Sequence, residues 1–376
     1  MPWNGSIRRA WRLPLARAAL LLLATAALGV WFAEATPSGE GRRFAAASAY
    51  SARHGGSALL VLEGGRVCWE EEARGARWEG RQRIFSGTKG FWILAALRAV
   101  QEGIFSLDAP VAETVAEWRS DPVKRRITVR ELLNFTSGLE PAFFLHADGV
   151  ENRNARALFL PLLARPGQAF LYGPASLQVF HEFFRRRLLP RQETPTHFLE
   201  TRVLRPMGLG RQRYLEDGAG NPLLATGFLL RAREWAAIGD VLVHRGAPIL
   251  RPEVLEEALR GSAVNPAFGM AFWNNRAASL PDAREVEVEA MLSRPWQSQD
   301  WRNACLWREG PTDLVAAVGS HGQRLYVIPS QGWIVVRQGY SYSFSDADFL
   351  RLLLPGVYGA RPITARGADL SSPSER

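Results

Sequence analysis

The chain has 376 residues, of which 47% are hydrophobic and 22% charged, and its formal net charge is +9. This is the composition of a globular protein with one large or two ordinary domains. No tandem repeat, zinc-finger spacing or basic helix with interleaved aromatic residues occurs in it. The positive charge therefore indicates a solvated basic surface and not a nucleic-acid site.

Residues 1–35 have the pattern of a secretory signal peptide. Four arginines precede an uncharged run of 16 residues, which ends at the small-x-small signature Ala33-Glu34-Ala35. The run is shorter than the roughly 20 residues that span a bilayer. We expect cleavage, with retention as an inner-membrane anchor and an ordinary buried helix as alternatives. The first two interpretations place the remaining chain in the periplasm or outside the cell.

After a polar linker at residues 36–43, the segment 57–71 predicts a β-hairpin, because two apolar runs flank Gly64-Gly65. A helix is predicted from about Ser86 to Gln101, and Gly103 is suited to end it. Before this helix a charged turn leads to Ile84 and Phe85.

Cys68 and Cys305 are the only two cysteines, and both have hydrophobic neighbours. In an exported protein the pair could form a disulfide. Their surroundings equally suit buried thiols in strands, and they do not resemble metal ligands. We leave both interpretations open.

Residues from about 105 to 265 carry mostly helical signals, including a capping box at Thr128–Glu131 and a helix in 231–246. Strand patterns return after residue 266, and FGMAFW (268–273) is a candidate strand beside a cleft. A terminal helix is predicted at about 345–354, followed by a disordered tail at 359–376. Strands at both ends of the chain predict an α+β fold, in which an antiparallel sheet is completed by the C-terminal strands around an inserted helical subdomain.

Lys89 is one of only two lysines, because 44 of the 46 basic residues are arginine. A desolvated lysine can give up its proton and act as a base, whereas arginine stays protonated. Ser86 lies three residues upstream, and residues i and i+3 share a face of a helix. Serine is a weak nucleophile that needs an adjacent base. The alternative is an N-cap serine beside a surface lysine.

Four segments follow one another in a characteristic order. They are FSGTKGFW (85–92), ITVRELLNFTSGLEP (127–141), FLYGPASLQVF (170–180) and AVGSHGQRLYVIPS (317–330). The first fits an S-x-x-K element. With them the chain resembles the serine β-lactamase and penicillin-binding-protein superfamily, over roughly residues 45–355. The nearest members are class C β-lactamases, related esterases and 6-aminohexanoate-dimer hydrolases. The resemblance implies a β-lactamase/transpeptidase-like domain at 44–358.

The resemblance also implies roles for single residues. Tyr172 matches the tyrosine that works with the lysine as general base, if an adjacent ammonium lowers the pKa of its phenol. Gly322 and Gln323 match the strand position whose backbone N–H would complete an oxyanion hole with that of Ser86. His321, in the same stretch, is a candidate substrate contact, although a lone histidine on a strand is more often structural.

Two positions depart from the family pattern. The Y-x-N element reads Tyr172-Gly173-Pro174, so the side-chain amide of its asparagine is missing. Ser320 occupies the position of the lysine in the K-T-G element. Both changes weaken the case for a β-lactamase or a D,D-peptidase. We therefore predict an exported serine hydrolase for a small-molecule ester or amide, which needs no metal or cofactor. The alternatives are a β-lactamase or D,D-peptidase and a non-catalytic binding or scaffold protein of this fold.

Overall fold

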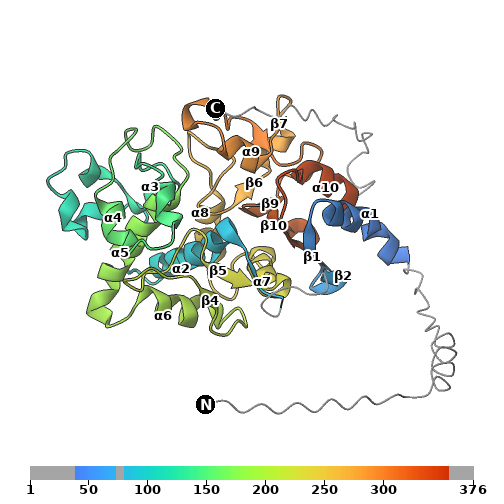
Figure 1. Cartoon of the computed structure of the whole chain (residues 1–376), viewed down its shortest axis with the longest axis horizontal. Helices are drawn as coiled ribbons and strands as arrows, with labels where there is room; N and C mark the ends of the chain where they lie inside the picture. The colour runs from blue at the N-terminus through green and yellow to red at the C-terminus, as the bar shows by residue number, and fades with distance from the viewer. Residues whose placement is uncertain (1–38, 73–79, 355–376) are drawn as a thin grey trace, which may run out of the picture. The chain divides into compact units, whose positions relative to one another are not determined.

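The computed structural model describes residues 39–72 and 80–354 (Figure 1). The predicted signal peptide and C-terminal tail lie outside these residues. The central element is a six-stranded antiparallel sheet in the order β2-β1-β11-β10-β9-β6. Its strands are β1 (Gly56–Glu63), β2 (Arg66–Glu72), β6 (Trp273–Asn274), β9 (Val315–Gly319), β10 (Gln323–Ile328) and β11 (Trp333–Gly339).

The first and last strands of the chain lie side by side, as the sequence predicted. The hairpin around Gly64-Gly65 forms β1 and β2, and β1 pairs with β11 in a register that places Leu60 opposite Val336. The C-terminal strands therefore complete the N-terminal hairpin, and the predicted α+β class is confirmed.

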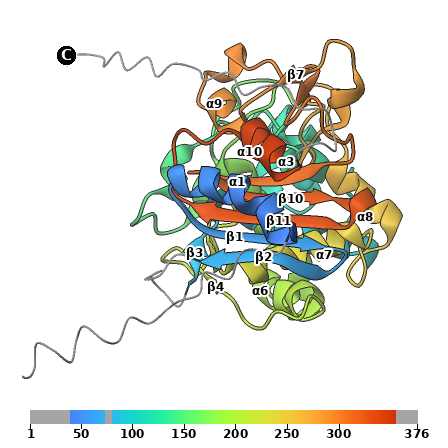
Figure 2. The same cartoon turned by 90° about the vertical axis from the view of Figure 1, so that its right-hand side faces the viewer.

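Helices cover both faces of this sheet. On one face α1 (Gly39–Arg53) and α10 (Asp346–Leu353) pack against each other, in front of the strands in Figure 2. On the opposite face α7 (Ala232–Val243) packs against β10 and β11. Because both faces are covered, every residue of β9, β10 and β11 is buried. Strands buried on both faces favour apolar runs, and these strands have them at residues 315–318, 325–328 and 333–336. The buried polar residues lie towards the strand ends and are Gln323, Arg324, Arg337 and Gln338.

Most of the predicted helical segment lies beside the sheet, on the left of Figure 1. Its α3 keeps the predicted capping box between Thr128 and Glu131. Helix α7 lies within the range predicted for the helical subdomain (about 105–265), but it packs against the sheet, on β10 and β11. The other helices are α2 (Lys89–Gln101), α3 (Val129–Leu133), α4 (Arg153–Leu158), α5 (Pro174–Leu188), α6 (Pro195–Leu199), α8 (Pro252–Leu259) and α9 (Val288–Leu292).

Short elements connect these parts. A three-stranded sheet is formed by β3 (Gln82–Arg83), β5 (Phe228–Leu230) and β4 (Arg213–Tyr214), and a parallel pair by β7 (Arg284–Glu285) and β8 (Ala304–Cys305). Among the single helical turns, two matter for the site: η1 (Phe85–Thr88) and η5 (Phe143–His146).

Three expectations need correction or can now be settled. The predicted linker ends early, because α1 begins at Gly39. Residues 268–273 are not a strand: only Trp273 belongs to β6, and Phe268 makes an isolated bridge to it. Cys68 and Cys305 are free thiols in strands, so they form no disulfide.

Within residues 39–72 and 80–354, no helix has the length and apolar character needed to cross a membrane.

Candidate active site

Ser86 lies on η1, the turn between β3 and α2. The preceding residue, Phe85, has a φ of 44°, which is an outlier for a bulky side chain. This left-handed residue reverses the chain just before Ser86 and leaves the serine partly exposed at the start of the helical segment. The sequence predicted a helix from Ser86; the regular α-helix begins three residues later, at Lys89.

Two glycines allow η1 to sit close to its neighbours. A Cβ on Gly87 would lie 2.4 Å from the Trp235 ring of α7. A Cβ on Gly319, the last residue of β9, would lie 2.2 Å from the carbonyl oxygen of Ile84. Real Cβ atoms do not approach other heavy atoms this closely, so only glycine fits at either position. The end of β9 therefore lies against the turn that carries Ser86.

Lys89 is fully buried in the first turn of α2. Its Nζ donates to the carbonyl oxygen of Ala225 at 3.3 Å and lies 4.6 Å from the centroid of the Tyr172 ring. In the described part of the chain no carboxylate pairs with this amine. Burial holds the pKa of Lys89 well below its usual value, because removal from water disfavours the charged form.

Tyr172 lies two residues before α5, and the Ser86 side chain is near enough to its hydroxyl to favour the ionised phenol. Its ring packs against Phe135 and Phe268, at 5.0 and 5.9 Å between centroids. Burial raises the pKa of the Tyr172 phenol and outweighs the effect of the Ser86 side chain, which lowers it; the Glu289 carboxylate raises it further. Tyr172 could act as a general base only if an adjacent ammonium lowered the pKa of its phenol, and this condition is not met, because desolvation dominates.

The structure thus brings Ser86, Lys89 and Tyr172 together, although 83 residues separate the serine and lysine pair from the tyrosine. The amine lies over the tyrosine ring, and the Ser86 side chain lies near the tyrosine hydroxyl. This arrangement places a serine hydroxyl, an amine of lowered pKa and a phenol at one position, and acyl transfer to serine needs a nucleophile with an adjacent base.

The turn between β9 and β10 carries the other predicted residues. His321 lies beside the nucleophile turn, with its ring 5.0 Å from that of Phe85. Its backbone N–H donates to Oε2 of Glu289 at 2.9 Å, and that of Gly322 donates to Oε1 at 3.0 Å. Gln323 is buried, and its side chain donates to the carbonyl oxygen of Gly339.

Gly322 was therefore wrongly predicted as an oxyanion-hole donor. Its N–H is already bound to a carboxylate from α9, so it has no hydrogen left for a substrate oxygen. Gln323 lies one residue further along β10, and it is Gly319, at the end of β9, that meets the Ser86 turn. Nothing in the sequence near 317–330 could have indicated the Glu289 contact.

The sequence also gave no signal for His146, on η5. Its Nδ1 lies 3.4 Å from Oγ1 of Thr226, the residue after the carbonyl that binds Lys89. Burial, and then the nearby charge of Lys89, lowers the pKa of His146 to about 4. The buried Arg153 holds the backbone on both sides of this histidine, since it donates to the carbonyl oxygens of residues 145 and 147 at 2.6 and 2.7 Å. His146 is thus a fixed, neutral group near the amine.

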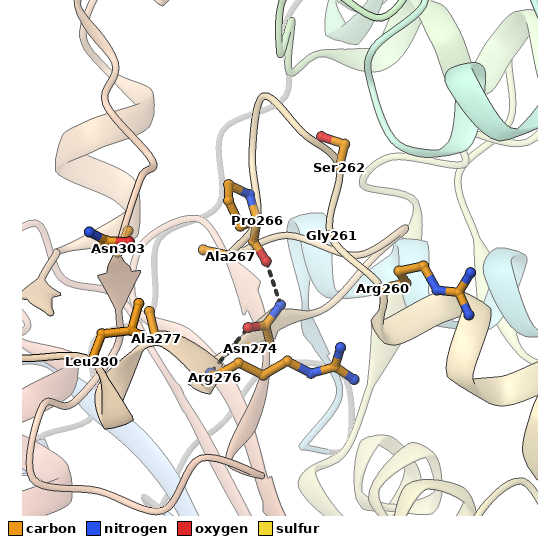
Figure 3. A pocket seen from close by; sticks show the side chains of 11 residues that line it. Arg260, Gly261, Ser262, Pro266, Ala267, Asn274, Arg276, Ala277, Leu280 and Asn303 are labelled. Atoms are coloured by element: carbon orange, nitrogen blue, oxygen red, sulfur yellow. Dashed lines mark hydrogen bonds between the residues drawn. The ribbon is translucent and has the colours of Figure 1, made fainter.

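A cavity lies beside β6 (Figure 3). This cavity, of about 340 Å³, includes Arg260, Ser262, Asn274 and Arg276 in its lining. Asn274 is committed to the carbonyl oxygen of Pro266, at 2.9 Å. None of the residues around Ser86 lines the cavity, and it holds no serine beside a lysine or histidine. Its chemistry does not suit acyl transfer, so the candidate site is the one at Ser86.

Comparison with known proteins agrees with this geometry. A family model described as Beta-lactamase matches residues 42–338. The chain belongs to this family. The predicted resemblance and the β-lactamase/transpeptidase-like fold are thereby confirmed, and with them a serine hydrolase at the level of the family.

Individual members of the family are more distant. Esterase EstB from Burkholderia gladioli is 32% identical over 154 residues, which cover 36% of this chain and 39% of that protein. The chain thus matches well under half of this relative's length. The structure of EstCE1, a hydrolase with promiscuous acyltransferase activity, is similar to this one with a TM-score of 0.62 at 18% sequence identity. The match covers 85% of this chain and 98% of the EstCE1 chain. A putative 6-aminohexanoate-dimer hydrolase from Bacillus anthracis has a TM-score of 0.56 at 14% identity, covering 81% and 78%. At these identities the two structures show the fold alone.

Proposed function

We propose that the protein hydrolyses an ester or a small amide through an acyl-enzyme formed on Ser86. One observation carries the proposal: a lysine without a carboxylate partner is buried three residues after a partly exposed serine. A buried amine with a lowered pKa is the kind of base that a serine nucleophile needs.

In the proposed mechanism Lys89 takes the proton from Ser86 as its Oγ attacks the carbonyl carbon. Tyr172 remains a phenol, because its pKa is raised, and its hydroxyl orients Ser86 and donates a hydrogen bond towards the leaving group. As the tetrahedral intermediate collapses, the leaving alcohol or amine receives the proton held by Lys89 through the Tyr172 hydroxyl, and Lys89 becomes neutral again. Water then attacks the acyl-enzyme, Lys89 takes its proton as the base, and that proton passes to Ser86 Oγ as the acid product leaves. The base role that was assigned to the lysine and tyrosine together thus falls mainly to Lys89.

The tetrahedral oxyanion would be bound by two backbone N–H groups. One is that of Ser86, at the start of the helical segment. For the second we propose Ser320 in place of Gly322. Ser320 follows Gly319, which lies against the carbonyl of Ile84, and among the described residues no hydrogen bond uses the Ser320 N–H.

Ester substrates are favoured over β-lactams. The name of Esterase EstB supports this choice, as do Ser320 and Pro174, which leave out the cation and the amide of the family motifs. One observation favours the β-lactamase or D,D-peptidase alternative. Arg83 lies three residues before Ser86, is exposed, and has no ion pair within the described residues, so it could attract a carboxylate.

A non-catalytic binding or scaffold protein is the less favoured alternative. Burying an ionisable amine without a charged partner costs free energy. A protein that uses its cleft only to bind a ligand has no need to keep Lys89 at such a position.

A fluorophosphonate probe tests the proposal directly. The probe should label the wild-type protein and fail to label Ser86→Ala. Ser262→Ala is the matched control, because Ser262 lines the other cavity, and it should be labelled like the wild type. Labelling that survives Ser86→Ala would contradict the proposal.

We also propose that the protein is exported to the periplasm or secreted, on the strength of the signal-peptide pattern in residues 1–35. An uncleaved segment would attach it to the inner membrane. Fractionation of a bacterial host should find the full chain outside the cytoplasm and a chain without residues 1–35 inside it. A cytoplasmic full chain would contradict export.

A further inference from the structure

Two exposed tyrosines lie close to the turn that carries Ser86. The described residues include five strongly exposed aromatic side chains, which are Phe143, Phe144, Phe159, Tyr340 and Tyr342. Tyr340 and Tyr342 follow β11 and pack on His321, whose ring meets that of Phe85, the residue before Ser86. Single exposed apolar residues need no explanation, but a gathered set marks a binding surface.

These rings form one connected group, here called the aromatic platform: Phe85, His321, Tyr340 and Tyr342. The His321 ring stacks on Tyr340, with centroids 4.1 Å apart, and meets Phe85 and Tyr342 edge-on, at 5.0 Å from each. Tyr340 and Tyr342 are perpendicular, and their hydroxyls share a hydrogen bond of 2.9 Å. The platform therefore starts at the residue next to Ser86 and extends outward.

The outer part of the platform remains open to solvent. Tyr340 is 58% exposed and Tyr342 83% exposed, although both rings pack against neighbours in the platform. Their free surfaces can therefore accept another ring, which stacks or meets them edge-on as these rings already meet each other.

The backbone under the platform is held in place. Glu289 binds the N–H groups of His321 and Gly322, and Ser341 donates its N–H to the carbonyl oxygen of His321 at 3.0 Å. The N–H of Tyr340 donates to the carbonyl oxygen of Gly55 at 2.9 Å. A surface fixed in this way loses little conformational freedom when a ligand binds.

Charges of both signs lie next to the platform. The Arg83 guanidinium is 5.1 Å from the centroid of the Phe85 ring, and the Glu289 carboxylate binds the turn on the other side of His321. A charged ring would meet one like and one opposite charge, so charge gives it no net advantage. It would also lose hydration on packing against the platform, a cost that an uncharged ring avoids.

We infer that the aromatic platform is a substrate subsite that selects esters or amides carrying an uncharged aromatic ring on the acyl or the alcohol side. The inference rests on the proposed hydrolase function and names its substrate class. An aliphatic ring of similar size would make the hydrophobic contact but would lack the attraction between aromatic rings. This attraction corresponds to about a two- to tenfold preference for the aromatic substrate per contact.

Matched esters test this inference. Ethyl 3-phenylpropanoate is compared with ethyl 3-cyclohexylpropanoate for the acyl side, and benzyl acetate with cyclohexylmethyl acetate for the alcohol side, with kcat/KM measured by pH-stat. The wild type should prefer the aromatic ester by about fivefold on at least one side. The variant with both Tyr340→Leu and Tyr342→Leu should reduce that ratio to below about twofold. Because each ratio is measured on one protein sample, partial loss of folded enzyme cancels.

The control is Phe159→Leu, which removes an equally exposed ring away from the platform and should keep the wild-type ratio. A wild-type ratio near one on both sides, or a ratio that survives in the double variant, would overturn the inference while leaving the hydrolase function intact. Failure to hydrolyse any ester would instead count against the proposed function. The subsite is then judged by ligand-observed NMR with 3-phenylpropan-1-ol and 3-cyclohexylpropan-1-ol, and equal binding of the two alcohols would overturn it.

Discussion

The two lysines of the chain show how position determines the chemistry of one residue type. Lys124 is partly exposed, and its Nζ donates to the carbonyl oxygens of Leu158 and Leu160 at 3.3 and 2.7 Å. Lys89 is fully buried and has one such carbonyl. Burial lowers the pKa of both amines, and that of Lys89 much further. Lys124 therefore has a structural role, and Lys89 is the candidate base.

Replacing Lys89 by arginine should abolish most of the activity without unfolding the protein. Arginine keeps the positive charge but cannot accept a proton. We expect kcat for an aryl ester to fall by about 10²–10⁴, the usual effect of losing a general base. Lys124→Arg is the control and should change kcat little. A Lys89→Arg enzyme within about threefold of the wild type would show that Lys89 is electrostatic or structural, since that is far below the range for a lost base.

The pH dependence should identify the base. Lys89 acts only when neutral, so kcat/KM should rise with pH through the lowered pKa of Lys89 and be lost on acidification. His146, with a pKa of about 4, is neutral above that pH and should not cause this rise of kcat/KM with pH. In the His146→Gln variant, kcat/KM should therefore rise over the same pH range as in the wild type. Loss of the rise in this variant would show that the histidine causes it.

At the scale of elements, α9 fixes the turn between β9 and β10. Glu289 accepts hydrogen bonds from the N–H groups of His321 and Gly322 and, at 2.8 Å, from Nη1 of Arg324. Both turn residues have positive φ, at 64° and 78°. The carboxylate thereby compensates for an unfavourable backbone conformation and places the ring of His321 beside Phe85.

Glu289→Ala should therefore lower the free energy of unfolding by about 1–3 kcal/mol, as expected for the loss of charge-assisted hydrogen bonds. It should also reduce kcat/KM for aromatic esters, because the turn carries part of the aromatic platform. Urea denaturation provides the measurement. Glu256→Ala is the control: its carboxylate pairs with Arg276 on the surface, where such pairs contribute about 0–1 kcal/mol. Equal effects of the two substitutions would contradict the role of Glu289.

At the scale of the whole molecule, a buried polar network joins the sheet to α9 and α10. Arg324 and the hydroxyl of Tyr326, both on β10, donate to the fully buried Asp346. Glu287 accepts from the side chain of Ser345 at 2.6 Å and from the N–H of Asp346 at 3.2 Å. Burial, and then the charge of Asp346, raises the pKa of Glu287 to about 7.

This raised pKa should make stability depend on pH. The folded pKa of Glu287 lies above the ordinary value of 4.5, so its contribution is fully present below pH 4.5 and is lost as the pH rises through about 7. Urea denaturation at pH 5.5 and pH 8 should show a decrease in the free energy of unfolding for the wild type. The decrease should be smaller for Glu287→Gln, which cannot ionise. An equal decrease in both proteins would show that Glu287 does not cause it.

Substrate preference is also a property of the whole site. We expect measurable hydrolysis of p-nitrophenyl acetate or butyrate and poor turnover of nitrocefin or benzylpenicillin. The missing cation at Ser320 and the missing amide at Pro174 should each reduce lactam turnover by roughly ten- to a hundredfold. A kcat/KM for nitrocefin above that for the esters would favour the β-lactamase alternative and point to Arg83 as its cation.

Features that depend on neighbours along the chain could be predicted from the amino-acid sequence. The proximity of Ser86 and Lys89 follows from helical spacing, and the capping box of Thr128 and the hairpin at Gly64 follow from local backbone chemistry. The order of the motifs was enough to indicate Tyr172 and the fold. These features could be predicted because they need no knowledge of packing.

Which groups are free and which are desolvated follows from the folded structure. The N–H of Gly322 is bound by a carboxylate 33 residues away, and His146 lies near Lys89 without any motif. Burial raises the pKa of Tyr172, whose role as a base depended on an adjacent charge lowering it. Hydrogen-bond partners and burial are set by contacts between segments far apart in the chain. A pattern of residue types does not contain those contacts, so the chemical state of the site had to come from the folded molecule.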